Sequence, residues 1–233
     1  MHRPQTYFIS GTDTEVGKTF VTRALLHAAR RQGMATLAMK PVAAGVGADG
    51  RNEDVEQLIA ASSVKAARDL VNPYCFGAAI APHIAAAAER RTIEADLIVA
   101  AFRQLAKQTD LLLVEGVGGF RVPLGDDFDT ADLAVHLGLP VILVVGLRLG
   151  CLNHALLTAE AIAVRGLPLA GWIANRIEPD MPRWQDNIAA LRQRLAAPLL
   201  GVLPWLGGPG GADSVAAASH LRLPWEQPPG IAD

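Results

Sequence analysis

A glycine-bearing segment near the N-terminus has the residue types that bind a polyphosphate. Residues 11–19 are Gly-Thr-Asp-Thr-Glu-Val-Gly-Lys-Thr, directly after the short apolar run Tyr7–Ile9. Glycines let successive backbone N–H groups converge on a phosphate, and a following helix adds its positive end. Lys18 can reach the β- and γ-phosphates, and the Thr19 hydroxyl can ligate Mg²⁺. We predict a phosphate-binding loop, slightly wider than the common one because five residues separate Gly11 from Gly17.

Three charged residues follow predicted strands or lie close after them. Glu115 ends the apolar run Leu111–Val114, Lys40 ends a second strand before Pro41, and Asp54 comes after a Gly-rich excursion. Ligands of open α/β sheets bind at the carboxyl ends of the strands. We expect Glu115 and Asp54 to bind Mg²⁺ and Lys40 to offset charge in phosphoryl transfer. A helix-terminal or surface acid, and a solvated lysine, are the structural alternatives.

Acids inside the loop itself are unexpected, because they repel phosphate. Asp13 and Glu15 are therefore expected to face a cation, such as an amine substrate. Asn175, followed by Arg176, ends a strand and could contact an adenine edge or cap a turn. The segment Gly150-Cys151-Leu152-Asn153 opens a helix that could hold a substrate carboxylate or be an Asn-assisted helix start.

Strand-like runs alternate with helical patterns along the chain, which predicts a mostly parallel α/β sheet with helices on both faces. With the phosphate loop, this indicates a P-loop NTPase-like fold in one domain, residues 1–233. Residues 71–81 are expected to be irregular, and the Gly/Pro-rich segment from about residue 205 is expected to wrap the surface as a loop. The expected strands are 6–10, 35–39, 111–115, 141–145, 169–175 and 199–203. The expected helices are 18–32, 54–61, 82–90, 94–108, 130–137, 152–165 and 183–195.

Composition excludes several classes of protein. The 233 residues carry a net charge of −2, so no overall attraction to nucleic acid or an anionic membrane is expected. The longest apolar stretch, residues 139–147, is about half of what a spanning helix needs. Two cysteines are too few for a disulfide scaffold, and we expect a cytoplasmic protein.

The chain resembles the dethiobiotin synthetase family from Tyr7 to about Trp205. The resemblance is carried by an ordered set of motifs: Gly11–Thr19, Lys40–Ala43, Val71–Tyr74, Val114–Gly119, Leu149–Ala155, Ala170–Asn175 and Pro204–Leu206. It implies that CO₂ and 7,8-diaminopelargonate form a carbamate that attacks the γ-phosphate of MgATP. The second amine then closes the cyclic urea and releases phosphate.

The resemblance also implies a role for each matched residue. Lys18 and Lys40 would stabilise the carbamate and the transferring phosphoryl group, and Thr19, Asp54 and Glu115 would hold Mg²⁺. The family is a homodimer, and Gly150, Cys151, Leu152 and Asn153 would take the substrate carboxylate across its interface. Thr14 and Glu15 would lie near the diamine. The nucleotide would contact Glu15, Val16, Gly17, Lys18, Thr19, Phe20, Asp54, Glu115, Gly116, Val117, Gly118, Asn175, Arg176, Pro204, Trp205 and Leu206.

Two departures from the family and two rival functions stand beside this interpretation. Ala44 replaces a common serine that can bond the substrate, and an acid near Gly211 is missing, for which Asp213 could substitute. A cobyrinate-type amidoligase would need ammonia, usually from a glutaminase domain that this chain has no room for. A partitioning-type ATPase characteristically has an extra lysine near the start of the loop, where Thr12 and Asp13 stand here.

Overall fold

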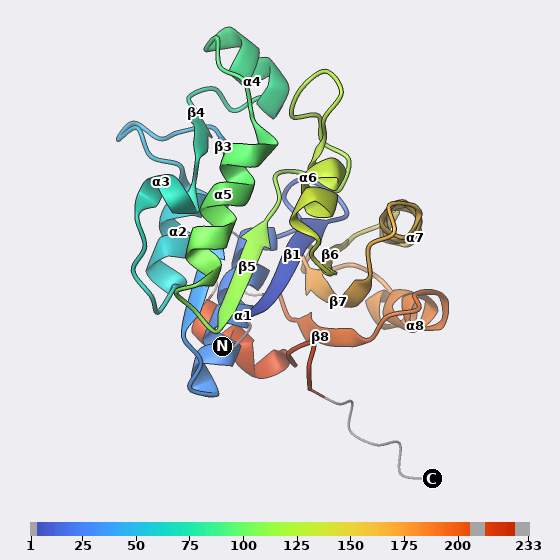
Figure 1. The fold of residues 1–233 in the computed structure, drawn as a ribbon. Helices are drawn as coiled ribbons and strands as arrows, with labels where there is room; N and C mark the ends of the chain where they lie inside the picture. Colours follow the sequence, from blue (N-terminus) through green and yellow to red (C-terminus); the bar gives the residue numbers. More distant parts are fainter. Residues whose placement is uncertain (1–3, 206–212, 227–233) are drawn as a thin grey trace.

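A six-stranded parallel sheet forms the centre of the molecule, which we describe from a computed structural model covering residues 4–205 and 213–226 (Figure 1). Its strand order is β2-β5-β1-β6-β7-β8, and every neighbouring pair is parallel. The expected fold class is therefore confirmed. The strands are β1 (Gln5–Gly11), β2 (Thr36–Met39), β5 (Leu111–Glu115), β6 (Val141–Leu147), β7 (Leu169–Arg176) and β8 (Leu199–Leu203).

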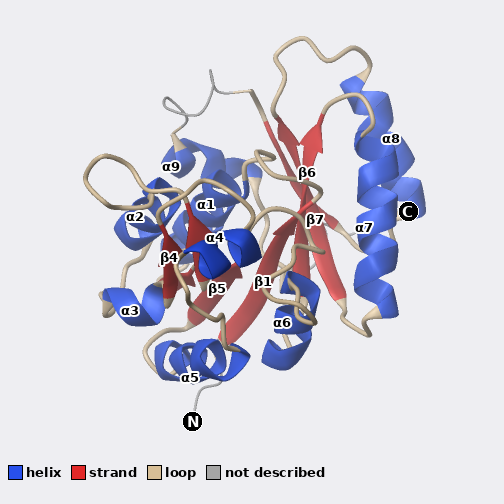
Figure 2. Cartoon of the chain, turned by 90° about the horizontal axis from the view of Figure 1, so that it is seen from above, coloured by secondary structure: helices blue, strands red, loops and turns tan. Residues whose placement is uncertain are grey.

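Helices cover both faces of this sheet because its strands are apolar on both sides (Figure 2). Along β1, Phe8 joins one hydrophobic cluster with residues of α5 and α6, while Ile9 joins another with residues of α1. A third cluster seats α7 and α8 against β6 and β7, around the fully buried Trp172. These helices are α1 (Lys18–Arg31), α2 (Glu53–Ala61), α5 (Ala95–Ala106), α6 (Thr130–Leu137), α7 (Cys151–Val164) and α8 (Trp184–Arg194). None of the helices in the described ranges is long and apolar enough to cross a bilayer.

A second, two-stranded parallel sheet corrects the expectation that residues 71–81 are irregular. β3 (Val42–Ala44) pairs with β4 (Tyr74–Phe76), and Val42 lies opposite Tyr74. Strands of three residues are too short to show the period-two pattern by which a strand is recognised. The short helices α3 (Arg68–Val71) and α4 (Pro82–Ala88) flank β4.

The C-terminal segment was expected to be a surface loop, and this is wrong for residues 213–226. They form α9 (Ser214–Ala217) and the 3₁₀ turn η1 (Ala218–His220), followed by a bridge from Leu221 to Gly201. Ala217, Ala218 and Leu221 are buried in the cluster of α1. The Asp213 carboxylate accepts hydrogen bonds from two backbone N–H groups of α9, so it is the cap of this helix.

Candidate active site

The loop between β1 and α1 has the geometry of a phosphate cradle. Gly17 immediately precedes α1 with a φ of 86°, and Glu15 also has a positive φ of 60°. A Cβ atom at Gly17 would lie 2.2 Å from Nδ2 of Asn175, so glycine is required there for both conformation and space. The first N–H groups of α1, from Lys18 onward, have no partner within the helix. They are available to bind an anion at the positive helix end.

Asn175 fixes the position of this loop. Its Nδ2 donates a buried hydrogen bond of 2.9 Å to the backbone oxygen of Val16, although the two residues are far apart in the sequence. The Val16 side chain packs against Gly146 on β6, where a Cβ atom would lie only 2.8 Å away. Asn175 therefore holds the phosphate loop against β7. This role differs from the two predicted from the sequence, an adenine contact and a turn cap.

Lys18 lies inside the loop and is almost fully buried. Its Nζ donates to the backbone oxygen of Asp13 at 3.0 Å. Burial, together with the nearby Lys40 ammonium, lowers the pKa of Lys18 to about 8, against the opposing effect of the Glu115 and Asp54 carboxylates. Binding of a phosphate would supply the negative charge that the ammonium lacks at close range.

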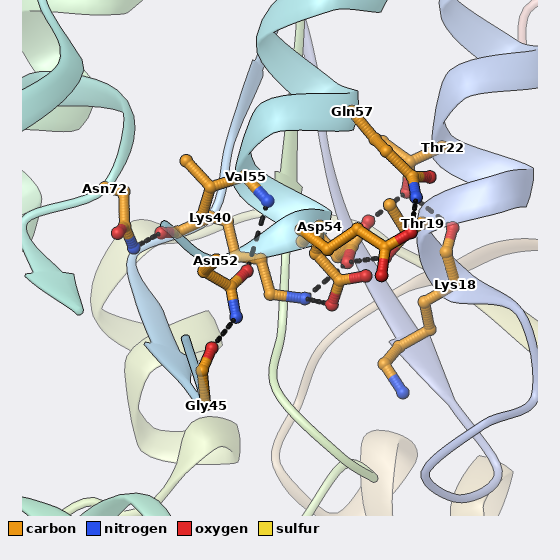
Figure 3. A network of polar contacts seen from close by, with 12 residues as sticks. Lys18, Thr19, Thr22, Lys40, Gly45, Asn52, Asp54, Val55, Gln57 and Asn72 are labelled. Carbon is orange, nitrogen blue, oxygen red and sulfur yellow. Dashed lines mark hydrogen bonds and ion pairs between the residues drawn. The ribbon is translucent and has the colours of Figure 1, made fainter. Parts of the chain in front are cut away.

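Lys40, Asp54 and Glu115 form a compact ion cluster at the carboxyl edge of the sheet. Figure 3 shows Lys40 and Asp54 pointing toward each other. Nζ of Lys40 lies 2.6 Å from Oδ2 of Asp54 and 2.7 Å from Oε1 of Glu115. Burial disfavours the Lys40 ammonium, but the two carboxylates outweigh this and raise the pKa of Lys40. Burial likewise opposes ionisation of Asp54, and Lys40 more than compensates, so the pKa of Asp54 is lowered. The three residues predicted from strand ends are thus brought together.

The oxygen atoms around this cluster suit Mg²⁺. The Thr19 hydroxyl donates to Oε1 of Glu115 at 2.7 Å, and it is also close enough to Asp54 to help lower the pKa of that carboxyl. Across the described part of the chain, no cluster of three or more His, Cys, Asp or Glu side chains could hold a metal by itself. Two carboxylates and a hydroxyl leave positions for phosphate oxygens and water, which is the coordination Mg²⁺ prefers beside a nucleotide.

The loop after β5 lies beside the phosphate loop. A Cβ atom at Gly118, which has a φ of 63°, would lie 3.5 Å from Oγ1 of Thr14. Gly116 donates its N–H to the backbone oxygen of Ile9 at 3.0 Å. Val117 follows Gly116 in the same loop, so the predicted nucleotide contacts 116–118 and the predicted substrate contact Thr14 share one side of the site.

Asp13 faces a cation, as expected for the acids of the loop, but this cation is a side chain of the protein itself. Its carboxylate pairs with the guanidinium of Arg148, which lies between β6 and α7. The Arg148 guanidinium therefore balances the repulsion between the Asp13 carboxylate and a phosphate in the loop. Glu15 is exposed, and its role toward an amine stays a prediction.

A helix begins at Cys151, close to the expected start, but the Cys151 side chain, which was predicted to contact the substrate, is buried. Gly150 precedes it with a φ of 92°, and the Cys151 side chain is buried, with Sγ 3.9 Å from Oδ1 of Asn187. Leu152 and Asn153 lie in the first turn, where backbone N–H groups lack intrahelical partners. The ion pair of Arg148 with the phosphate loop brings this turn toward the nucleotide site.

The structure brings the residues predicted to contact adenine together only in part. Asn175 pairs in register with Leu203, so Pro204 and Trp205 follow the neighbouring strand at the same edge. The guanidinium of Arg176, however, stacks over the ring of Trp184 at 4.8 Å. Leu206 lies outside the described residues.

Three polar residues that support the ion cluster of Lys40, Asp54 and Glu115 were not predicted from the sequence. Asn52 caps α2 through the N–H of Val55, Asn72 donates to the backbone oxygen of Lys40 at 2.6 Å, and Thr22 donates to Glu115 (Figure 3). An asparagine just before two acids is a recognisable helix cap, so Asn52 could have been found. Thr22 lies one turn after Thr19, a spacing that shares a helix face.

Known proteins that are similar to this chain indicate its family. A family model described as an AAA domain matches residues 5–209. The ATP-dependent dethiobiotin synthetase BioD of Aromatoleum aromaticum is 60% identical over 227 residues, which cover 96% of this chain and all of the relative.

Solved structures show the same fold at low identity. Chloroplast FtsY from Physcomitrella patens has a TM-score of 0.52 and 17% identity; the match covers 94% of this chain and 65% of that one. The MinC:MinD cell division complex of Aquifex aeolicus gives a TM-score of 0.52 and 16% identity, with coverage of 86% and 81%. At these identities the likeness shows a shared P-loop NTPase fold alone.

Proposed function

The chain belongs to the dethiobiotin synthetase family, and from this we propose that it closes the cyclic urea of dethiobiotin from 7,8-diaminopelargonate, CO₂ and ATP. The observation that carries the proposal is the buried pair of Lys40 with Glu115, next to a phosphate loop whose own lysine points into the cradle. A positive side chain in addition to the loop lysine is what a phosphoryl transfer to a carbamate requires. The continuous fold supports a single synthetase domain, residues 1–233.

In the proposed reaction, the protein mainly positions charges. The amides at the start of α1 and the Lys18 ammonium bind the β- and γ-phosphates of ATP. Lys40 stabilises the carbamate oxygen that attacks the γ-phosphorus and the charge that develops on the transferring group. ADP leaves as the bond from the carbamate oxygen to the γ-phosphorus forms. The second amine then attacks the carbamate carbon and loses a proton, and phosphate leaves with the oxygen that had joined carbon to phosphorus. No side chain of the protein is needed as a nucleophile.

We propose that Thr19, Asp54 and Glu115 hold Mg²⁺ when MgATP is bound. The ion would offset the charge of the β- and γ-phosphate oxygens. The hydrogen bond from Thr19 to Glu115, and the ion pairs that Lys40 makes with both carboxylates, support their assignment to one site. Because Lys40 lies between the two carboxylates, a cation bound there competes with its ammonium for the same oxygen atoms.

The remaining contacts follow from the same premise. Thr14 and Glu15 would face the diamine, and Asn175, Pro204, Trp205 and Leu206 would flank the adenine, with Arg176 contributing through its backbone. Asp213 is the α9 cap, which argues against its replacing the missing acid near Gly211. With Ala44 on β3, the protein lacks one hydroxyl toward the substrate, and we expect weaker substrate affinity from that change.

We also propose a homodimer in which residues 150–153 bind the substrate carboxylate at the interface. Leu157 and Val164, seven residues apart on α7, are exposed apolar side chains on one helix face. Leu149, just before α7, is 96% exposed. An apolar strip of this kind beside the site is typical of a surface that another subunit covers.

The direct test is product formation by the purified chain. With ATP, Mg²⁺, bicarbonate and the diamine, mass spectrometry should detect dethiobiotin, and phosphate release should require both the diamine and bicarbonate. Lys40→Gln should abolish turnover while it leaves MgATP binding within about tenfold, or about 1.4 kcal/mol. Phosphate release that needs neither co-substrate, without dethiobiotin, would contradict the proposal.

A further inference from the structure

Thr22 is a fully buried hydroxyl that the proposed chemistry does not use. It lies on α1, one turn after Thr19, and has no exposed surface. Its Oγ1 is 2.8 Å from Oε2 of Glu115 and 2.8 Å from the backbone oxygen of Lys18 (Figure 3). A hydroxyl has one proton to donate, so these two acceptors compete for it.

The Glu115 carboxylate is the better acceptor of the two. The Lys18 carbonyl already receives the backbone N–H of the helical residue four positions later, as in any α-helix. A hydrogen bond to a carboxylate is shorter and about twice as strong as one between neutral groups. Oε2 of Glu115 is buried, so the loss of its donor would leave an unpaired charged oxygen in the core.

The two oxygens of Glu115 have different partners. Oε1 contacts the Thr19 hydroxyl and the Lys40 ammonium, whereas Oε2 contacts Thr22. The terminal torsion of a glutamate has broad minima, so the side chain by itself does not fix the orientation of its carboxylate plane. The bond from Thr22 fixes this torsion and directs Oε1 toward Thr19 and Lys40.

We propose that Thr22 is a positioning residue that orients the Glu115 carboxylate toward the metal and Lys40. The inference rests on the magnesium site in the proposed function. Thr22 does not touch ATP or the metal in this role; it acts through Glu115. Partners that orient a ligating carboxylate commonly contribute 10–100-fold to metal affinity.

The test is a Mn²⁺ titration followed by electron paramagnetic resonance, with the non-hydrolysable β,γ-imido analogue of ATP present. Thr22→Val has nearly the same volume and lacks the hydroxyl, whereas Thr22→Ser retains the hydroxyl. We expect Thr22→Val to weaken Mn²⁺ binding about tenfold and Thr22→Ser to stay within about twofold of wild type. The affinity for the analogue without metal should be unchanged in both.

The outcomes separate this inference from the metal site on which it depends. Glu115→Gln should also weaken Mn²⁺ binding. Wild-type Mn²⁺ affinity in Thr22→Val, with a clear loss in Glu115→Gln, would overturn the role of Thr22 and leave the site standing. Wild-type affinity in both would overturn the site itself. If Thr22→Val does not fold, Thr22→Ala replaces it, and wild-type affinity there would equally refute the inference.

Discussion

Replacement of Lys40 by methionine should destabilise the protein mainly through the loss of its ion pair with Glu115, and less through the loss of its ion pair with Asp54. The side chains of Lys40 and Glu115 are 4% and 0% exposed, and their charged atoms are 2.7 Å apart. Removal of one partner from a buried pair costs about 3–5 kcal/mol, because the other charge stays buried. Thr19 and Thr22 still donate to Glu115, which favours the lower end, about 3 kcal/mol.

Asp54 provides the matched control. Its side chain is 44% exposed although it lies 2.6 Å from the same ammonium, so water can solvate its charge. The change Asp54→Asn should therefore cost no more than about 1 kcal/mol. Asp54→Asn removes only the pair with the half-exposed carboxylate, so a small cost there assigns most of the Lys40→Met loss to the buried pair with Glu115.

Urea unfolding followed by circular dichroism measures the free energy of unfolding of the Lys40→Met and Asp54→Asn proteins. For a chain of this size a loss of about 3 kcal/mol lowers the Tm by about 6–12 °C. The double change Lys40→Met with Glu115→Gln should recover much of the loss, with a coupling of about 2–3 kcal/mol between the sites. A Lys40→Met protein within about 0.5 kcal/mol of wild type, at an unchanged urea slope, would show that the buried pair of Lys40 with Glu115 does not stabilise the fold.

Three further changes test other parts of the site. Asn175→Asp removes the donor to Val16 and places a carboxylate near the Val16 carbonyl oxygen. Calorimetry should therefore show ATP binding weakened at least about tenfold. An unchanged Kd would contradict the role of Asn175 as an anchor of the loop. Because the pKa of Lys18 is lowered from 10.5 to about 8, the free protein loses this proton as the pH rises past about 8, while the unfolded chain keeps it to about 10.5. Lys18 therefore makes unfolding less favourable as the pH rises from about 8 to about 10.5. ATP binding near pH 9 should be accompanied by proton uptake, which calorimetry in two buffers detects. Zero proton uptake would rule out a requirement for a charged Lys18. Leu157→Asp should shift light scattering from dimer to monomer, whereas a monomeric wild type would remove the proposed interface.

The parts of the fold that are visible in the sequence are those with a strong local pattern. Leu111–Glu115 is a continuous apolar run that ends in an acid, and β5 has these bounds. The phosphate loop is also local, since glycines, lysine and the start of a helix lie within nine residues. Lys40 and Glu115 were expected at one edge because parallel strands share it, and their contact bears this out.

The features that were missed depend on partners distant in the sequence. Asp13 repels phosphate when the loop is considered alone, and only the fold brings Arg148 to it. Thr22 in the middle of a helical pattern looks like an ordinary residue until Glu115 is placed beside it. The tail packs through Leu221 against β8, and its Gly/Pro-rich lead-in gave no indication of that contact.

The most direct measurement of the proposed chemistry follows an oxygen atom from bicarbonate labelled with ¹⁸O. In the proposed reaction the carbamate oxygen attacks the γ-phosphorus, and the later break of its bond to carbon leaves that oxygen on phosphate. Mass spectrometry at times shorter than label exchange with water should find one labelled oxygen in each phosphate released. Released phosphate without label, its new oxygen coming from water, would contradict the account.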